Sequence, residues 1–266
     1  MTYDNFLFVG CGNMGGAMLD GWLAAGVPAR TFTIVDPGRE TAPDGVELLT
    51  ELPARKFEAV LLGIKPHMLG DLAADIARVT DENTRIFSVL AGVETATLAR
   101  YFPDAKARVR VMPNLAAKLG KSPIALVAEG LDEGERAEIA AFYDVLGQAE
   151  WLPDEDLFDL VTALAGSGPG FVYRFIDALA TGAANLGLPE DQARRLAVTM
   201  VDGAAALAAS SEHPPAELAR RVASPGGVTQ VGLDVMDEGD RAVKLMEDTL
   251  RGARDRSAEM AREARG

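Results

Sequence analysis

A glycine-rich turn between an apolar run and a helix-like segment most constrains what this chain can fold into. Gly10, Gly12 and Gly15 form the pattern G-x-G-x-x-G, directly after the apolar residues 6–9 and before residues 17–23, whose apolar positions have helical spacing. In such a unit the first glycine permits a tight turn, the second lets the backbone approach a pyrophosphate, and the third lets the helix pack closely on the strand. The exposed N–H groups and the helix dipole then hold the anion. The pattern therefore predicts a dinucleotide site at this turn.

An acidic residue at the end of the next apolar run supports the same interpretation. Asp36 follows Ile34 and Val35 and lies 21 residues after Gly15, close to the spacing of a ribose-binding carboxylate. Asp36 would accept hydrogen bonds from a ribose 2′-hydroxyl and repel a 2′-phosphate, whereas Arg39 would pair with that phosphate. Because these two side chains favour opposite cofactors, both NADH and NADPH stay open.

Apolar runs and helical segments alternate over the first part of the chain. Strands are predicted at residues 6–9, 34–36, 58–64, 85–90, 107–112, 122–127 and 150–152, and helices at 17–23, 68–79, 94–101 and 132–146. Such alternation is typical of an α/β domain with a mostly parallel sheet covered by helices. The strand ends would bring Lys65, Pro66, Ala91 and Asn114 to the rim that carries the glycine-rich turn.

The pattern changes near Pro153, after which no segment has the character of a strand. Helices are predicted at residues 157–164, 169–186, 189–209, 215–222 and 240–262. We therefore expect a Rossmann-like dinucleotide-binding domain over residues 1–153 and an all-α domain over residues 154–266. Helices without a sheet leave apolar surface uncovered, so we expect a second subunit to cover part of it.

Two glycine-rich interruptions divide the helical part, at residues 166–170 and 224–229. In the second, Pro225 and two glycines are suited to opening a helix whose first N–H groups face a ligand. Ser224 and Thr229 add hydroxyl groups at the same place. The pattern favours a site for a small carboxylate, and a plain helix–helix turn is the alternative.

Composition excludes several other classes of function. The formal net charge is −14, which argues against a nucleic-acid-binding surface. Cys11 is the only cysteine, so neither a disulfide framework nor a cysteine-based zinc site is expected, and we predict no metal. No signal peptide or transmembrane stretch is predicted, and the expected location is the cytoplasm. His67 and His213 are both interpreted as bystanders.

Six short motifs, in order, resemble pyrroline-5-carboxylate reductase, which reduces a cyclic imine to L-proline. They are Gly10-Cys11-Gly12-Asn13-Met14-Gly15, Lys65-Pro66, Ser88-Val89-Leu90-Ala91-Gly92-Val93, Met112-Pro113-Asn114, Gly166-Ser167-Gly168-Pro169 and Ser224-Pro225-Gly226-Gly227-Val228-Thr229. The resemblance implies a Rossmann domain, a helical dimerisation domain, and NADPH or NADH as hydride donor. It also implies a homodimer, or an assembly of such dimers, with a site shared between two subunits.

The resemblance also implies roles for individual residues. The substrate carboxylate would be held by the backbone of Ser224, Gly226, Gly227, Val228 and Thr229, and the Thr229 hydroxyl, the one catalytic contact, would bond the ring nitrogen. The cofactor would be bound by Gly10, Gly12, Asn13, Met14, Gly15, Asp36, Arg39, Lys65, Pro66, Ala91 and Asn114. Asp36 stands where the family commonly has Ser or Asn, which weakens the family's lean toward NADPH.

Two further classes remain as alternatives. One is a related imine reductase or β-hydroxyacid dehydrogenase; the latter would require a helix-borne catalytic lysine after the first domain. After Lys121 the only lysine is Lys244, which lies beyond both glycine-rich interruptions. The other is a nucleotide-sensing protein without turnover, which would keep Gly10–Gly15 and would not need Thr229.

Overall fold

The computed structural model describes residues 3–265, with side chains as far as residue 263. Contacts divide the chain into a sheet unit, which runs to Ser167 and resumes at Gly252, and a helical unit, Gly168–Arg251. The predicted boundary at residues 153 and 154 follows the change in sequence pattern, whereas the compact units divide later. Residues just beyond that boundary contact residues before it: the Arg110 guanidinium, for example, donates a hydrogen bond of 2.7 Å to the Glu155 carboxylate.

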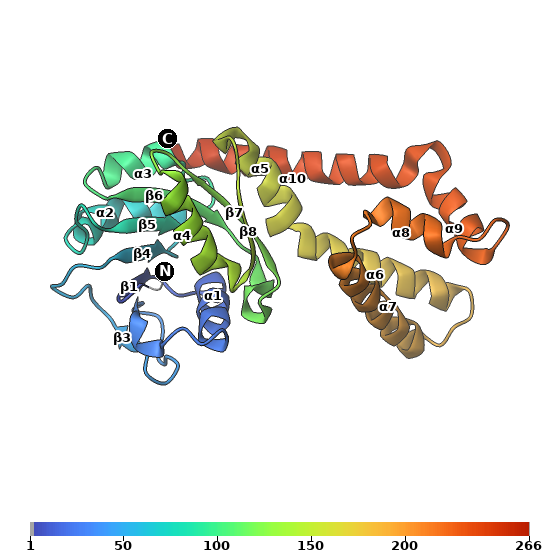
Figure 1. Cartoon of the computed structure of the whole chain (residues 1–266), viewed down its shortest axis with the longest axis horizontal. Coiled ribbons are helices and arrows are strands. Elements are labelled where there is room, and N and C mark those ends of the chain that lie inside the picture. The colour runs from blue at the N-terminus through green and yellow to red at the C-terminus, as the bar shows by residue number, and fades with distance from the viewer. Residues whose placement is uncertain (1–2, 266) are drawn as a thin grey trace. The chain divides into compact units, whose positions relative to one another are not determined.

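The sheet unit contains one sheet with the strand order β3-β2-β1-β4-β5-β6-β7-β8 (Figure 1). The strands are β1 (Phe6–Val9), β2 (Phe32–Val35), β3 (Glu47–Leu49), β4 (Ala59–Leu62), β5 (Arg85–Ser88), β6 (Ala107–Met112), β7 (Ser122–Ala128) and β8 (Gly147–Trp151). All neighbouring strands pair in parallel except β6 and β7. The prediction of a mostly parallel sheet is therefore confirmed, although β3 was missed.

Helices cover both faces of this sheet because its strands are apolar on both sides. They are α1 (Asn13–Ala24), α2 (Leu69–Ala77), α3 (Thr95–Tyr101) and α4 (Glu133–Asp144). Successive residues of β1 alternate between two cores. Phe6 and Phe8 pack in an aromatic core that includes Trp22 of α1 and Phe142 of α4. Leu7 and Val9 belong to a mainly aliphatic core with side chains from α2 and α3.

The strand order creates a crevice at the carboxyl ends of β1 and β4. The chain leaves β1 for β2 on one side and later returns to form β4 on the other, which is the topological switch point where open α/β sheets bind ligands. Gly10, with φ +81°, and Gly63 pass in backbone contact there. A Cβ on Gly63 would lie 2.5 Å from the Gly10 carbonyl oxygen, and one on Gly10 would lie 2.9 Å from the Gly63 carbonyl carbon.

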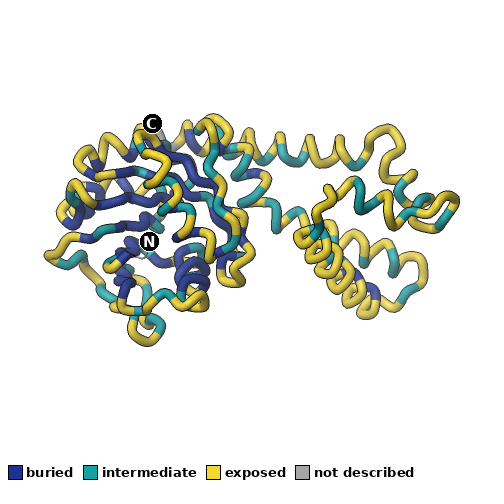
Figure 2. Tube along the Cα trace, in the orientation of Figure 1, coloured by how far each residue is buried: buried dark blue, intermediate teal, exposed yellow. Residues whose placement is uncertain are grey.

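The helical unit contains α6 (Gly168–Asn185), α7 (Glu190–Ser210), α8 (Pro215–Val222), α9 (Val228–Asp237) and the first part of α10 (Arg241–Arg265). Figure 2 shows most of its trace as exposed. Among its described side chains only Ala193 and Ala197 are buried, while Leu207 is 70% exposed. Within its own chain this unit therefore leaves most of its large apolar side chains uncovered.

One predicted helix, over residues 157–164, differs from the observed structure. A short helix, α5 (Phe158–Val161), is followed by a π-helical turn, Thr162–Gly166. The Ser167 N–H donates to the Thr162 carbonyl, which gives the five-residue spacing of a π-turn. The Asn114 side-chain amide also donates to the Ala165 carbonyl at 2.9 Å, a long-range contact that no local pattern reveals. No helix among the described residues combines the length and apolar character needed to cross a membrane.

Candidate functional site

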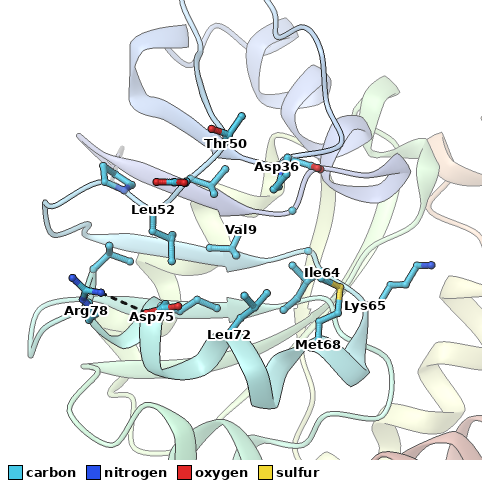
Figure 3. A pocket seen from close by; sticks show the side chains of 18 of the residues that line it. Val9, Asp36, Thr50, Leu52, Ile64, Lys65, Met68, Leu72, Asp75 and Arg78 are labelled. Carbon is cyan, nitrogen blue, oxygen red and sulfur yellow. Dashed lines mark ion pairs between the residues drawn. The ribbon is translucent and has the colours of Figure 1, made fainter.

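A cavity of about 1010 Å³ lies in the sheet unit at the crevice beside β1, β2 and β4 (Figure 3). Its volume is at the upper end of the range for small-molecule pockets. Apolar side chains line much of it, among them Leu52, Ile64, Met68 and Leu72, and Asp36 lines it from the end of β2. The sequence does not mark these four apolar residues, because they belong to no motif and meet only through the fold.

The glycine-rich turn forms one wall of this cavity and leaves room for an anion. Gly12 is the N-cap of α1, with φ −72° and ψ −157°, and no side chain caps the helix. A Cβ on Gly12 would meet nothing within 4 Å, so the turn faces open space. A Cβ on Gly15 would lie 3.5 Å from the Gly10 carbonyl oxygen, which is an ordinary van der Waals contact. This arrangement fits a pyrophosphate held by the first N–H groups of α1.

Asp36 and Arg39 are both tied to that turn by hydrogen bonds. The two carboxylate oxygens of Asp36 accept from the Cys11 N–H at 2.9 Å and the Gly38 N–H at 3.0 Å. The Arg39 guanidinium donates to the Cys11 carbonyl at 2.9 Å and to the Thr41 carbonyl at 2.7 Å. The structure thus brings Asp36, Arg39 and the turn together, as predicted, and adds contacts among them that the sequence did not reveal.

The thiol of Cys11 is enclosed by the same turn. Burial raises the pKa of Cys11 to about 11, and the nearby Arg39 guanidinium only partly offsets this effect. The thiol therefore stays protonated at neutral pH, which agrees with a packing role rather than a reactive one.

The other predicted cofactor residues lie in different surroundings. Lys65 lines the cavity but is exposed, and its side chain points away from the apolar lining (Figure 3). Pro66 begins a 3₁₀ turn, Pro66–Met68. Ala91 precedes Gly92, whose backbone packs against Ala261 of α10. Asn114 is buried; its side chain accepts from the Ala116 N–H and donates to the Ala165 carbonyl, so it braces the end of β6.

The second glycine-rich interruption forms a tight turn in the helical unit. It connects the end of α8 to α9, whose N-cap is Gly227 and whose first helical residue is Val228. Gly226 has φ +69°, and the Gly227 N–H donates to the Ser224 carbonyl at 2.8 Å. Thr229 is exposed in the first turn of α9. No side chain caps this helix, so its first N–H groups are available to an anion.

The fold and the glycine-rich turn together define a Rossmann-type dinucleotide-binding protein with an attached helical unit. The two matching family models agree with this class. Residues 155–260 match the model described as pyrroline-5-carboxylate reductase dimerisation, and residues 5–92 match that described as NADP oxidoreductase, coenzyme F420-dependent.

Relatives over nearly the whole chain identify the family. The chain is 34% identical to pyrroline-5-carboxylate reductase of Pseudomonas aeruginosa, and the match covers 98% of each chain. It is 33% identical to pyrroline-5-carboxylate reductase 3 of Danio rerio, over 96% of this chain and 90% of the other. This chain belongs to the pyrroline-5-carboxylate reductase family.

Solved structures support the same assignment. The pyrroline-5-carboxylate reductase of Coxiella burnetii is 26% identical, with a TM-score of 0.89 and coverage of 96% of this chain and 98% of the other. The Plasmodium falciparum pyrroline carboxylate reductase with NADP bound is 21% identical, has a TM-score of 0.81 over 97% of this chain and 98% of the other, and shows the shared fold. The predicted family and fold class are both confirmed.

Proposed function

We propose that this chain reduces 1-pyrroline-5-carboxylate to L-proline, with NADPH or NADH as the hydride donor. The observation that carries the proposal is that this chain, a member of the family, has two helices that each follow a glycine-rich turn and have no side-chain cap at the N-terminus. One lies at Gly12 in the sheet unit and the other at Gly227 in the helical unit. Both the cofactor and the substrate carry an anionic group that such a terminus can hold.

The first terminus is assigned to the cofactor. The turn Gly10-Cys11-Gly12-Asn13-Met14-Gly15 would hold the pyrophosphate through its backbone, and the adjoining cavity would take the adenosine part. Asp36 lines that cavity and has lone pairs free for ribose hydroxyls beyond those used by Cys11 and Gly38. When bound, a reduced nicotinamide supplies the hydride. Arg39, Lys65, Pro66, Ala91 and Asn114 stay predicted cofactor residues.

The second terminus is assigned to the substrate. The N–H groups that open α9 at Val228 and Thr229 would hold the substrate carboxylate, and Ser224, Gly226 and Gly227 shape the turn. The Thr229 hydroxyl would accept a hydrogen bond from the protonated imine nitrogen. Hydride addition to the imine carbon moves the C=N π electrons onto nitrogen and leaves a secondary amine. A protonated imine is already electrophilic, so positioning can account for much of the catalysis without a strong acid.

The helical unit is assigned to pairing with a second copy of the chain. It lies within residues 155–260, which match a dimerisation family, and most of its large apolar side chains are exposed in the single chain. A stable monomer rarely leaves so much apolar surface open to water. The homodimer is therefore the proposed unit, and the cytoplasmic location stays a prediction.

The test is a cofactor-oxidation assay with the purified full-length protein. Synthetic pyrroline-5-carboxylate is added with NADH or NADPH, cofactor loss is followed by absorbance, and proline is quantified by mass spectrometry. We expect one proline per cofactor oxidised, and no oxidation without the imine. A β-hydroxyacid tested with oxidised cofactor is the control for the rival enzyme class. Cofactor binding without imine reduction would instead support a nucleotide-sensing protein and overturn the proposal.

A further inference from the structure

The cofactor preference that the sequence left open is addressed by the contacts of Asp36. Its side chain lines the cavity from the end of β2, and its two oxygens are fixed by the N–H groups of Cys11 and Gly38. Two backbone donors hold the carboxylate in one orientation, so it cannot swing away from a ligand without losing both bonds. A ribose 2′-hydroxyl would find an acceptor here, and a 2′-phosphate would meet a negative charge.

Arg39, three residues after Asp36, is the cation that the sequence suggests for a 2′-phosphate, and its Nε and Nη1 groups are already engaged. It donates to the Cys11 and Thr41 carbonyls, and one of its nitrogens lies 3.0 Å from the Cys11 sulfur. Arg39 does not line the cavity, whereas Asp36 does. The Nε and Nη1 groups hold the guanidinium at the Thr41 and Cys11 carbonyls, so a phosphate in the cavity would have to bind through Nη2 alone or displace the Cys11 carbonyl of the turn.

The cations that line the cavity are also unsuited to a phosphate beside Asp36. Arg55 is paired with Glu47 and bonds the Thr33 hydroxyl. The Lys56 ammonium donates to two backbone carbonyls, at 3.0 and 2.8 Å. Arg78 forms a 3.6 Å ion pair with Asp75, at a part of the cavity away from Asp36 (Figure 3). Lys65 is exposed, and its side chain points away from the apolar lining of the cavity.

We propose that this chain prefers NADH to NADPH, with Asp36 as the specificity-determining residue and Arg39 as a brace of the glycine-rich turn rather than a phosphate ligand. This inference rests on the proposed use of a nicotinamide cofactor. It adds that the discrimination occurs at the adenosine ribose, far along the cofactor from the reacting ring. Arg39 then serves both cofactors equally, because it positions the turn that binds their common pyrophosphate.

Equilibrium binding tests the preference without any substrate. NADH and NADPH share one fluorophore, so each is titrated into the full-length protein and its emission change is followed. A hydrogen bond to a charged group changes an affinity on the order of tenfold to a hundredfold. We expect NADH to bind at least about tenfold more tightly than NADPH. Equal affinities, or tighter binding of NADPH, would overturn the proposal even if no variant were made.

An Asp36→Ser variant tests the assigned residue. We expect the ratio of the two dissociation constants to move toward NADPH by at least about tenfold, since the repulsion and the ribose acceptor are both removed. The ratio is the readout because loss of the bond to the Cys11 N–H affects both cofactors alike. Glu40→Gln is the matched control; it removes one nearby negative charge outside the cavity, and the ratio should stay unchanged. An unchanged ratio in Asp36→Ser would reject the role of Asp36.

An Arg39→Gln variant separates a brace from a phosphate ligand. A brace predicts that both dissociation constants rise by a similar factor, so their ratio stays the same. A phosphate ligand predicts that only NADPH binding weakens, which would overturn the assignment of Arg39. These titrations do not involve pyrroline-5-carboxylate. A protein that binds NADH selectively but does not reduce the imine would disprove the proposed function and leave this inference standing.

Discussion

The open space in front of Gly12 makes a Gly12→Val substitution a sharp test of the cofactor site. A Cβ at this position meets nothing within 4 Å, and the backbone at φ −72° and ψ −157° is extended, so any residue can adopt it. The substitution should therefore fold without a clash. The added side chain would nevertheless stand where the turn receives a pyrophosphate.

The expected change in folding stability is small because two effects oppose each other. Valine is a poorer N-cap than glycine, which costs on the order of 1 kcal/mol. Replacing glycine also restricts the unfolded chain, which stabilises by about 0.4–1 kcal/mol where the native backbone is compatible. The free energy of unfolding should thus change by no more than about 1 kcal/mol. For a domain of this size that corresponds to a shift in Tm of roughly 2–4 °C at most.

The expected change in cofactor binding is large. Displacing the pyrophosphate removes two or more charge-assisted hydrogen bonds, each worth about 1.5–3 kcal/mol. The dissociation constant for NADH should rise by at least about a hundredfold, since 1.4 kcal/mol corresponds to a factor of ten. Fluorescence titration measures the affinity, and calorimetry of the same preparation measures Tm.

The neighbouring glycine provides the opposite control. Gly10 has φ +81°, and a Cβ there would lie 2.9 Å from the Gly63 carbonyl carbon. Gly10→Ala should therefore lower stability clearly, by about 1–3 kcal/mol for the backbone strain alone. A Gly12→Val protein that keeps its Tm and also binds NADH normally would show that the pyrophosphate does not lie at this turn, and the cofactor site would be wrong.

The other predictions concern the helical unit and the ion pair between buried Arg110 and half-buried Glu155. Thr229→Ala should lower kcat/KM for the imine roughly tenfold to a hundredfold, because one hydrogen bond of about 1–3 kcal/mol is lost, and NADH affinity should stay nearly unchanged. Thr229→Ser should retain most activity, whereas a fully active alanine variant would show that Thr229 is not part of the site. Light scattering should give twice the chain mass. Leu207 in α7 is 70% exposed in the single chain, so Leu207→Asp should weaken the dimer. An active monomer at low concentration would contradict the pairing. Burial alone would raise the pKa of Glu155, but hydrogen bonds from Thr95 and Arg110 outweigh it and lower the pKa below the usual value of 4.5. This stabilisation is thus present above about pH 4.5 and is lost as pH falls through the lowered pKa. In denaturation experiments at several pH values, Glu155→Gln should lower the free energy of unfolding at neutral pH by about 1–3 kcal/mol and should reduce the loss of stability in acid. A variant as stable as the parent at neutral pH would show that the ion pair contributes nothing.

Local sequence signals predicted most of the sheet and helices because those elements are marked by patterns of burial. Residues 6–9 are apolar throughout, and every position of β1 is buried, so their composition was sufficient. The strand Glu47–Leu49 has only three residues, none of them fully buried, at the edge of the sheet beside β2. So short an edge strand has no periodicity to detect, and its pairing with β2 decides its conformation.

The candidate site was predictable where backbone chemistry decides and unpredictable where distant side chains decide. Gly12 was assigned from the G-x-G-x-x-G pattern, and Gly227 from a proline and two glycines suited to opening a helix; both are N-caps in the structure. Asn114 shows the limit of such reasoning. Its position at a strand end predicted a cofactor contact, whereas its described hydrogen bonds run to Ala116 and to Ala165, 51 residues further on.

The same physical device serves both proposed binding sites, and comparison with a third helix shows why it suits anions. α4 closes its own N-terminus: the Asp132 side chain accepts from the Glu135 N–H, and Glu135 bonds back to the Asp132 N–H. The N-caps of α1 and α9 are instead Gly12 and Gly227, which have no side chain that could accept from the helix. Their first N–H groups must therefore find partners outside the helix. A phosphate or a carboxylate supplies such a partner, and it does so at the positive end of the helix dipole without requiring a lysine or arginine. A strongly acidic chain can thus bind an anionic cofactor and an anionic substrate through its backbone.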